Sequence, residues 1–205
     1  MTRPRELPEL ASLRAVFPAL HRTQAGRPVA YFDGPGGTQV PTPVIESVTE
    51  YLARHNANTH WDYPTSRETD QILASARATL AAFLGGREEE VAFGANMTTL
   101  TFHAARAIGR DLKPRSTVLV TELDHHANVA PWRDIALERG LRVRTVRLDT
   151  GSARLDEDDL TAALAEEPAV VAVGAASNVL GTVTDVAAIT RAAKRAGALV
   201  FVDAV

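Results

Sequence analysis

The 205-residue chain contains no cysteine, which excludes disulfides, thiolate metal sites and a cysteine nucleophile within these residues. No apolar run approaches membrane-spanning length. Charges and prolines stand near the N-terminus, where a signal peptide would carry its apolar core. The net charge of −3 gives no electrostatic footprint for nucleic acid. We therefore expect a cytoplasmic enzyme or binding domain that has neither a membrane nor a nucleic acid as its partner.

The composition that remains is that of an ordinary globular protein, with 45% hydrophobic and 23% charged residues. A chain of this length can bury about 70% of its unfolded surface on folding. We expect residues 1–30 to form an N-terminal arm with a helix, and residues 31–205 to form one larger domain. Apolar spacing within that domain predicts helices at 43–55 and 66–84, the second ended by Gly85.

From residue 89 onward, stretches typical of strands alternate with stretches typical of helices. The strands are expected at 89–94, 116–123, 142–149, 169–177 and 198–205, and the helices at 97–109, 129–140, 156–166 and 185–197. Such alternation implies right-handed crossovers and a mainly parallel sheet. The apolar runs of the last two strands do not alternate, as in strands that are covered on both faces. The sequence therefore predicts an α/β fold with three layers, α/β/α.

Polar residues follow four of these strands, at the edge where parallel sheets bind ligands. Asn96 and Met97 stand at a helix start, where free backbone N–H groups and the helix dipole can hold a phosphate. For Asn96, simple N-capping of the helix is the favoured reading when the motif is taken alone. Asn178 follows a buried strand, and its amide can either hydrogen-bond a ligand oxygen or cap a turn.

The segment "DHHAN" has three interpretations. A buried histidine that is satisfied by the protein is common. A metal site built on Asp124, His125 and His126 is the second interpretation. In the third, the imidazole stacks on a planar ligand, with a neighbouring group fixing its orientation. These residues alone leave all three interpretations open.

Asp203 closes the apolar run "ALVFVD", so its carboxylate is expected at the end of a central strand. A buried carboxylate needs a positive partner or several hydrogen-bond donors. Either an arginine or a cationic ligand would serve. Because the position falls at the ligand-binding edge, we favour a functional role for Asp203.

Six stretches, "YFDGPGGTQVP", "NANTHWDYPTSRETD", "VAFGANMTTLT", "TELDHHANVAPW", "SNVLGT" and "VFVDAV", carry a resemblance that covers Tyr31 to Val205. The chain resembles the class V aminotransferase group of fold-type I pyridoxal phosphate (PLP) enzymes. Within that group it is similar to the cysteine desulfurases, the selenocysteine lyases and their desulfurase-like relatives. The resemblance implies a PLP-dependent enzyme that acts on an amino acid, forms a homodimer and delivers sulfur to an acceptor protein. A class V aminotransferase or epimerase-type activity is the alternative.

The resemblance also implies roles for individual residues. His125 would stack on the pyridine ring and take part in proton transfer. Asp203 would pair with the pyridine nitrogen and keep it protonated, which makes the ring a better electron sink. Asn178 would hydrogen-bond the phenolic oxygen of the ring. Asn96 and Met97 would contact the phosphate, largely through backbone N–H groups.

The sequence departs from the family pattern at several points. Asp124 stands where the family usually has a glutamate. The phosphate turn reads Gly94-Ala95-Asn96-Met97-Thr98, where the family usually has a Gly-Thr-Thr-Glu type turn. The only lysines are Lys113 and Lys194, and both occupy helical or turn contexts away from the strand ends. The family's Schiff-base lysine would lie beyond residue 205. We therefore expect this chain to be the N-terminal portion of a PLP enzyme, inactive by itself. A nucleotide- or metal-binding α/β domain and a non-catalytic paralogue are the alternatives from other classes.

Overall fold

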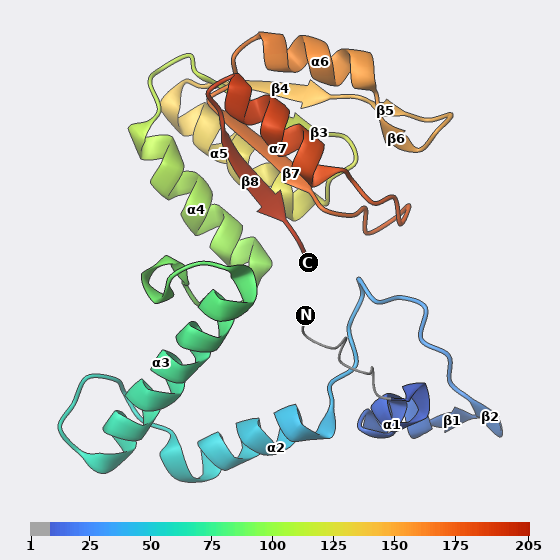
Figure 1. Ribbon diagram of the computed structural model, residues 1–205, viewed down its shortest axis with the longest axis vertical. Coiled ribbons are helices and arrows are strands. Elements are labelled where there is room, and N and C mark those ends of the chain that lie inside the picture. The colour runs from blue at the N-terminus through green and yellow to red at the C-terminus, as the bar shows by residue number, and fades with distance from the viewer. Residues whose placement is uncertain (1–8) are drawn as a thin grey trace, which may run out of the picture. The chain divides into compact units, whose positions relative to one another are not determined.

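The computed structural model describes residues 9–205 (Figure 1). The chain divides into two compact units, one ending at Ala92 and the other running from Phe93 to Val205. The predicted division into residues 1–30 and 31–205 stays a prediction, and the first eight residues of the arm lie outside the described residues.

The first unit consists mainly of helices. Its elements are α1 (Leu10–Ala15), the 3-10 helix η1 (Pro18–His21), the hairpin strands β1 (Thr23–Gln24) and β2 (Arg27–Pro28), α2 (Thr42–Glu50), the π-helical turn η2 (Tyr51–His55), α3 (Pro64–Leu84) and the 3-10 helix η3 (Glu88–Glu90). The two predicted helices are therefore present. Gly85 ends α3 in the left-handed conformation, with φ of 71°.

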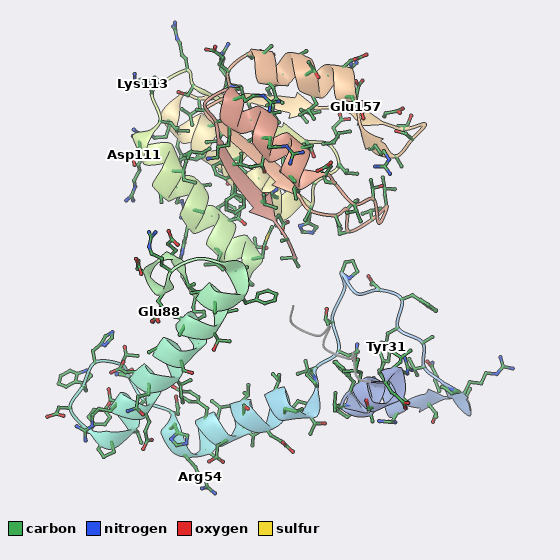
Figure 2. All side chains as sticks on the ribbon, viewed as in Figure 1. Tyr31, Arg54, Glu88, Asp111, Lys113 and Glu157 are labelled. Carbon is green, nitrogen blue, oxygen red and sulfur yellow. The ribbon has the colours of Figure 1, made fainter. Side chains whose placement is uncertain are left out.

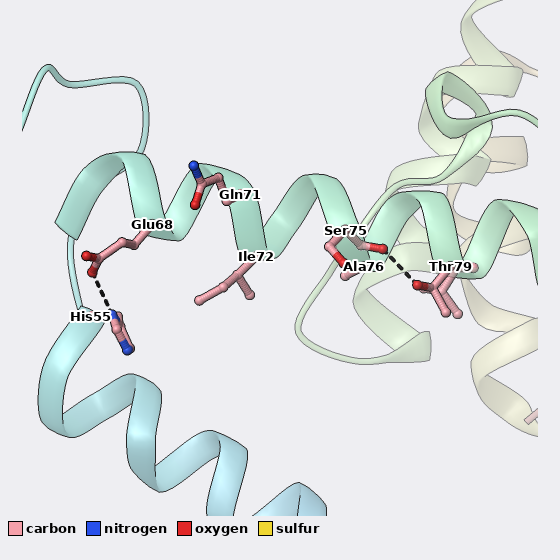
Figure 3. Close-up of a pocket in the computed structure, with 8 residues that line it drawn as sticks. His55, Glu68, Gln71, Ile72, Ser75, Ala76 and Thr79 are labelled. Carbon is pink, nitrogen blue, oxygen red and sulfur yellow. Dashed lines mark hydrogen bonds and ion pairs between the residues drawn. The ribbon is translucent and has the colours of Figure 1, made fainter. Parts of the chain in front are cut away.

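Few side chains of this unit are buried. Ala81 is the one hydrophobic residue buried among residues 9–92, although Ser66 and Thr69 on α3 are also buried. A shallow groove of about 690 Å³ lies beside α3 and η2 (Figure 3). At its end, the His55 imidazole and the Glu68 carboxylate are 2.6 Å apart. The unit is therefore held by local helix contacts more than by a hydrophobic core.

The second unit contains a parallel sheet of four strands in the order β4-β3-β7-β8. These strands are β3 (Thr117–Thr121), β4 (Arg142–Val146), β7 (Val170–Gly174) and β8 (Leu199–Asp203). The helices between them are α4 (Met97–Asp111), α5 (Ala130–Arg139), α6 (Glu157–Ala165) and α7 (Val186–Arg195). A 3-10 turn, η4 (His126–Asn128), precedes α5, and a small hairpin, β5 (Leu148–Asp149) with β6 (Arg154–Leu155), precedes α6.

The sheet separates two hydrophobic cores. Successive strand residues point to opposite faces, so Val118 and Val120 pack on one side and Leu119 on the other. The first core includes Trp132 of α5, whose ring meets that of Phe201 edge-on at 5.4 Å. The second core includes residues of α6 and α7. The predicted three-layer α/β/α architecture is confirmed (Figure 1).

Two predicted strands differ from the structure. Residues 89–94 form no strand, because no ladder partner reaches them among the described strands; they form the end of η3 and an irregular segment. The predicted strand 142–149 stops at Val146. There, the Asp159 and Glu122 carboxylates accept hydrogen bonds from the Arg147 and Leu148 amides at 2.8 Å each. The carboxylates thus accept the backbone N–H groups that would otherwise bond to a neighbouring strand if β4 continued.

Candidate functional site

Three neighbouring strands end at one edge of the sheet, two of them in a polar residue. β3 ends at Thr121, β7 at Gly174 and β8 at Asp203. Because the strands are parallel, their carboxyl ends share this edge. Gly174 pairs with Asp203 in the β7–β8 register, so Asp203 lies one strand spacing from the end of β7. The predicted convergence of strand ends is therefore present for β3, β7 and β8.

Asp124 is the most enclosed acid of this edge. The Thr121 hydroxyl donates to its Oδ2, and the Asn128 amide donates to its Oδ1 at 2.9 Å. The Gly174 amide adds a further hydrogen bond. Burial raises the pKa of Asp124 above its usual range, the nearby charge of Asp203 raises it further, and the three hydrogen bonds oppose this rise. The two carboxylates are therefore close enough to influence one another.

His125 lies on the exposed side of the same turn. It is the N-cap residue of η4, and its Nδ1 accepts a hydrogen bond from the Ala127 amide at 3.1 Å. An Nδ1 atom that accepts is unprotonated, so the neutral ring carries its proton on Nε2. His126, the next residue, is also exposed. The His125 side chain is thus oriented by its own turn and leaves Nε2 available.

Asp203 has one carboxylate oxygen tied locally, because its Oδ1 accepts from the Val205 amide at 3.2 Å. Its side chain is partly exposed. Across residues 9–205, neither Asp203 nor Asp124 forms an ion pair with an arginine, lysine or histidine. The sequence allowed an arginine as the partner of Asp203, but no arginine among these residues forms an ion pair with it.

The turn after β7 is capped by Ser177 and not by Asn178. The buried Ser177 hydroxyl accepts from the Val179 and Leu180 amides at 3.4 and 3.2 Å. The Asn178 side chain is exposed, and its amide forms no hydrogen bond within the described chain. The capping interpretation of Asn178 is therefore wrong, and its amide group is open to a ligand.

Asn96 and Met97 stand at the start of α4. Asn96 is the N-cap, and its Oδ1 accepts from the Thr99 amide at 2.9 Å, so the capping interpretation holds for its side chain. Leu100 donates the first intrahelical bond, to the Asn96 carbonyl. The amides of Met97 and Thr98 lie before that bond, at the positive end of the helix dipole. Backbone contacts to an anion thus remain available at this end.

The predicted residues are not all in contact. His125 follows Asp124, and Asp124 lies near Asp203. In the described residues no hydrogen bond or ion pair links Asn96, Met97 or Asn178 to these three. Figure 1 shows the start of α4 and the carboxyl end of β8 on the same side of the second unit. A narrow crevice between the ends of β3 and β7 is lined by residues that include Thr121, Asp124, Gly174 and Ser177.

Sequence reasoning gave no site role to Thr121 and Gly174, and considered Asp124 only as a metal ligand. The spacing of Thr121, Asp124 and Asn128 by three and four residues is a signal that could have revealed the hydrogen-bonded turn. Gly174 gave no signal, because its role depends on the neighbouring strand: a Cβ there would lie 2.8 Å from the Asp124 Oδ1. The strand end must therefore be glycine for the carboxylate to occupy its place.

The two lysines lie at the opposite edge of the sheet. Lys113 precedes β3, and Lys194 stands in the last turn of α7, just before β8. Figure 2 shows Lys113 beside Asp111, at the end of α4 that is far from the carboxyl end of β8. A strand of five residues spans about 16 Å. Neither ammonium group can therefore reach Asp203 or His125.

A metal site built on Asp124, His125 and His126 does not fit the geometry. The Asp124 carboxylate is directed at Thr121 and Asn128, while the His125 Nδ1 faces the Ala127 amide. In residues 9–205 no three histidine, aspartate or glutamate side chains are placed to hold a metal ion together.

Over the same residues, no helix is both long and apolar enough to cross a bilayer.

The architecture and its polar edge define a parallel α/β domain, covered on both faces, of the kind that binds a ligand at its strand ends. The chain belongs to the aminotransferase class-V family, which matches residues 30–205.

The chain is similar to proteins named as cysteine desulfurases. It is 36% identical to a cysteine desulfurase of Serratia proteamaculans over 194 residues, covering 93% of this chain and 48% of that protein. It is 33% identical to a probable cysteine desulfurase of Halobacterium salinarum, covering 95% of this chain and 48% of that protein. The apo structure of the Thermococcus onnurineus cysteine desulfurase is 26% identical, with a TM-score of 0.85 over 97% of this chain and 48% of that one. The chain thus spans about half the length of the relatives it matches.

Proposed function

We propose that residues 93–205 form the PLP-binding part of an enzyme that acts on an amino acid. The observation that carries this proposal is the Asp203 carboxylate at the end of β8, without a cationic partner among the described residues and beside the enclosed Asp124. A pyridinium N–H would supply the missing positive charge and one hydrogen-bond donor.

The other groups at the edge fit the rest of this cofactor. The amides of Met97 and Thr98 precede the first intrahelical bond of α4, which suits a phosphate group. The Asn178 amide is exposed and makes no hydrogen bond in the described chain, which suits a phenolic oxygen. His125 presents an exposed ring, which suits stacking on a planar group.

When bound, PLP serves as an electron sink for a carbanion next to its imine carbon. The chain's own residues would orient and tune that sink. An Asp203 carboxylate oxygen would accept the ring N–H and favour the protonated form. The Nε2 of His125, which carries the proton of the neutral ring, would be the atom that donates to or exchanges a proton with the substrate.

We extend the proposal to the whole protein as a cysteine desulfurase or selenocysteine lyase-like enzyme, because the matched relatives are named cysteine desulfurases. Class V aminotransferase or epimerase-type chemistry is the alternative. A homodimer, a cytoplasmic location and a sulfur-acceptor protein belong to the same proposal, on the strength of the sequence resemblance. Since Lys113 and Lys194 lie at the wrong edge, residues 1–205 would hold the cofactor by non-covalent contacts only.

The proposal is tested by binding of pyridoxamine 5′-phosphate, which needs no lysine, to the 205-residue chain. Loss of a hydrogen bond between charged groups costs about 1.5–3 kcal/mol, so Asp203→Asn should weaken binding roughly tenfold or more. Calorimetric or fluorescence titration gives the dissociation constant. Inorganic phosphate should bind both proteins equally, because its contacts lie at α4. Asp134→Asn, an exposed position on α5, is the matched control. Equal affinity of the Asp203→Asn variant and the unchanged chain would overturn the proposal.

A further inference from the structure

The Asp124 carboxylate joins the ends of three segments of the second unit. It accepts hydrogen bonds from Thr121, the last residue of β3, and from Asn128, the last residue of η4. It also accepts one from the amide of Gly174, the last residue of β7. Residues 121–128 are therefore closed into a loop by their own side chains, and that loop is attached to the neighbouring strand.

This arrangement has features of a built site. Asn128 is fully buried, and its Nδ2 is used to bind Asp124 while its Oδ1 has no hydrogen-bond partner in the described residues. Gly174 leaves the space that the carboxylate fills, since a Cβ there would lie 2.8 Å from Oδ1. Burying a polar amide with one oxygen unpaired is unfavourable, and an apolar residue at 128 would avoid that cost. Stability alone therefore does not explain the group.

His125 lies inside the closed loop, between Asp124 and the Ala127 amide that binds its Nδ1. The orientation of the imidazole depends on where that amide stands. The amide, in turn, depends on η4, whose last residue is held by Asp124. A chain of contacts thus runs from the partly buried Asp124 carboxylate to the imidazole of His125.

We propose that Asp124 is a positioning residue, which fixes the η4 turn so that His125 keeps Nδ1 inward and presents Nε2–H at the carboxyl edge of the sheet. The role rests on the proposed function, in which His125 faces the planar cofactor. In this role Asp124 acts on His125 through the geometry of its hydrogen bonds, and Gly174 at the end of β7 leaves the space that the Asp124 carboxylate occupies.

The experiment uses the 205-residue chain labelled with ¹⁵N-histidine, without ligand. Long-range ¹H–¹⁵N correlation spectra separate the two ring nitrogens of each imidazole and show which of them carries the proton. His125→Gln assigns the signals by their loss. In the unchanged chain, the two His125 nitrogens should be widely split, as expected for a fixed Nε2–H form. Asp124→Ala should collapse this split towards the average of the two tautomers.

Two variants separate geometry from charge. Asp124→Asn can keep both side-chain contacts, since its carbonyl oxygen accepts from Asn128 and its NH₂ group donates to the Thr121 hydroxyl. It should retain the wide split, and so should the control Asp134→Ala on exposed α5. If Asp124→Ala does not fold, as judged from the fluorescence of buried Trp132, Gly174→Ala tests the same contact by displacing the carboxylate.

Each outcome decides the question. Collapse of the split in Asp124→Ala or Gly174→Ala, with retention in Asp124→Asn, supports the positioning role. An unchanged split in both of the first two variants, or a collapse in Asp124→Asn, overturns it. Binding of pyridoxamine 5′-phosphate is measured separately on the unchanged chain. A chain that does not bind the ligand but shows the Asp124-dependent split would refute the proposed function and leave the positioning role intact.

Discussion

At the scale of single residues, the second unit contains two acids whose surroundings shift their pKa values in opposite directions. Burial raises the pKa of Asp124, whereas the hydrogen bond from Arg144 lowers the pKa of Asp159. Both side chains are enclosed, but one has uncharged donors and a negative neighbour, and the other has two arginines. Desolvation by burial therefore dominates the pKa of Asp124, whereas the hydrogen bond from a charged arginine dominates the pKa of Asp159.

The Asp124 shift predicts how stability depends on pH. Its pKa in the folded protein lies above the ordinary value of 3.8, so the folded state binds the proton more tightly than the unfolded state. The stabilisation of the folded state by protonated Asp124 is present at pH values below 3.8 and is lost as the pH rises through the folded pKa. Asp124→Asn cannot titrate, so its free energy of unfolding should fall less over that interval. Urea unfolding at a series of pH values measures the difference, and a constant difference between the two proteins would contradict the prediction.

At the scale of elements, a cluster of charges ties strand β4 to helix α6. Arg144 on β4 contacts Asp159 in the first turn of α6, and its Nε lies 3.4 Å from the Glu166 carboxylate at the other end. Arg147 reaches Asp156 at 3.2 Å and Asp159 at 3.6 Å. The Asp156 side chain caps α6 by accepting from the Asp159 amide at 2.9 Å. The edge strand β4 is therefore attached to both ends of helix α6.

Asp159→Asn should weaken this attachment. Because Asp159 is only 8% exposed and bonds both Arg144 and the Arg147 amide, the loss should be about 1–3 kcal/mol at neutral pH. Its folded pKa is lowered, so the stabilisation is present above pH 3.8 and is lost as the pH falls through the folded value. Chemical unfolding at neutral and acid pH checks this. A loss that persists unchanged in acid would refute the electrostatic explanation; Asp158→Asn, exposed on the same helix, is the control.

The contact between α4 and α5 depends on Gly109. A Cβ at this buried position would lie 2.4 Å from the Ile135 Cγ1. Gly109→Ala should therefore lower stability by about 1–3 kcal/mol, although alanine is the better helix former. Thermal unfolding measures the loss. Combining it with Ile135→Ala, which removes the clashing atoms, should cost less than the sum of the two single changes; simple additivity would show that the clash is relieved elsewhere.

The sequence predicted the elements that are buried on both sides and failed where structure depends on a distant partner. The strands that contain Val118, Val171 and Val200 are apolar runs in the sequence, so the sheet and its polar edge could be predicted. Residues 89–94 have a strand-like composition, but no described ladder partner. The position of Asp203 at the sheet edge could be predicted because the residue closes an apolar strand. The enclosure of the Asp124 carboxylate could not be predicted, because it depends on the end of β7 lying beside the end of β3.

At the scale of the whole molecule, the two units differ in how much apolar surface they bury. Within residues 9–205, Ala81 alone among the buried hydrophobic residues precedes residue 93. The central strand β3 is buried throughout and β7 is buried up to Gly174, whereas α3 exposes Ile72, Phe83 and Leu84. Local opening should therefore require much less free energy in the first unit than in the second.

Hydrogen exchange followed by mass spectrometry should show this difference. Peptides containing β3 and β7 should exchange slowest, because their amides open only when the second unit unfolds. Peptides from α3 should exchange faster, with the stretch around Ala81 the best protected of them. Exchange in α3 as slow as in β3 would contradict the expectation. The hairpin β5–β6, two residues per strand, serves as an internal reference for rapid exchange.

The two margins of the parallel sheet are chemically unlike. On one side, the edge strand β4 carries the exposed Arg142, and a positive side chain on an edge strand discourages pairing with a foreign strand. On the other side, β8 has no charged side chain before Asp203, and Leu199 and Val202 are 49% and 39% exposed. Growth of the sheet by an added strand is therefore directional: it is opposed by charge beside β4 and favoured beside β8, next to the carboxylate at the ligand edge.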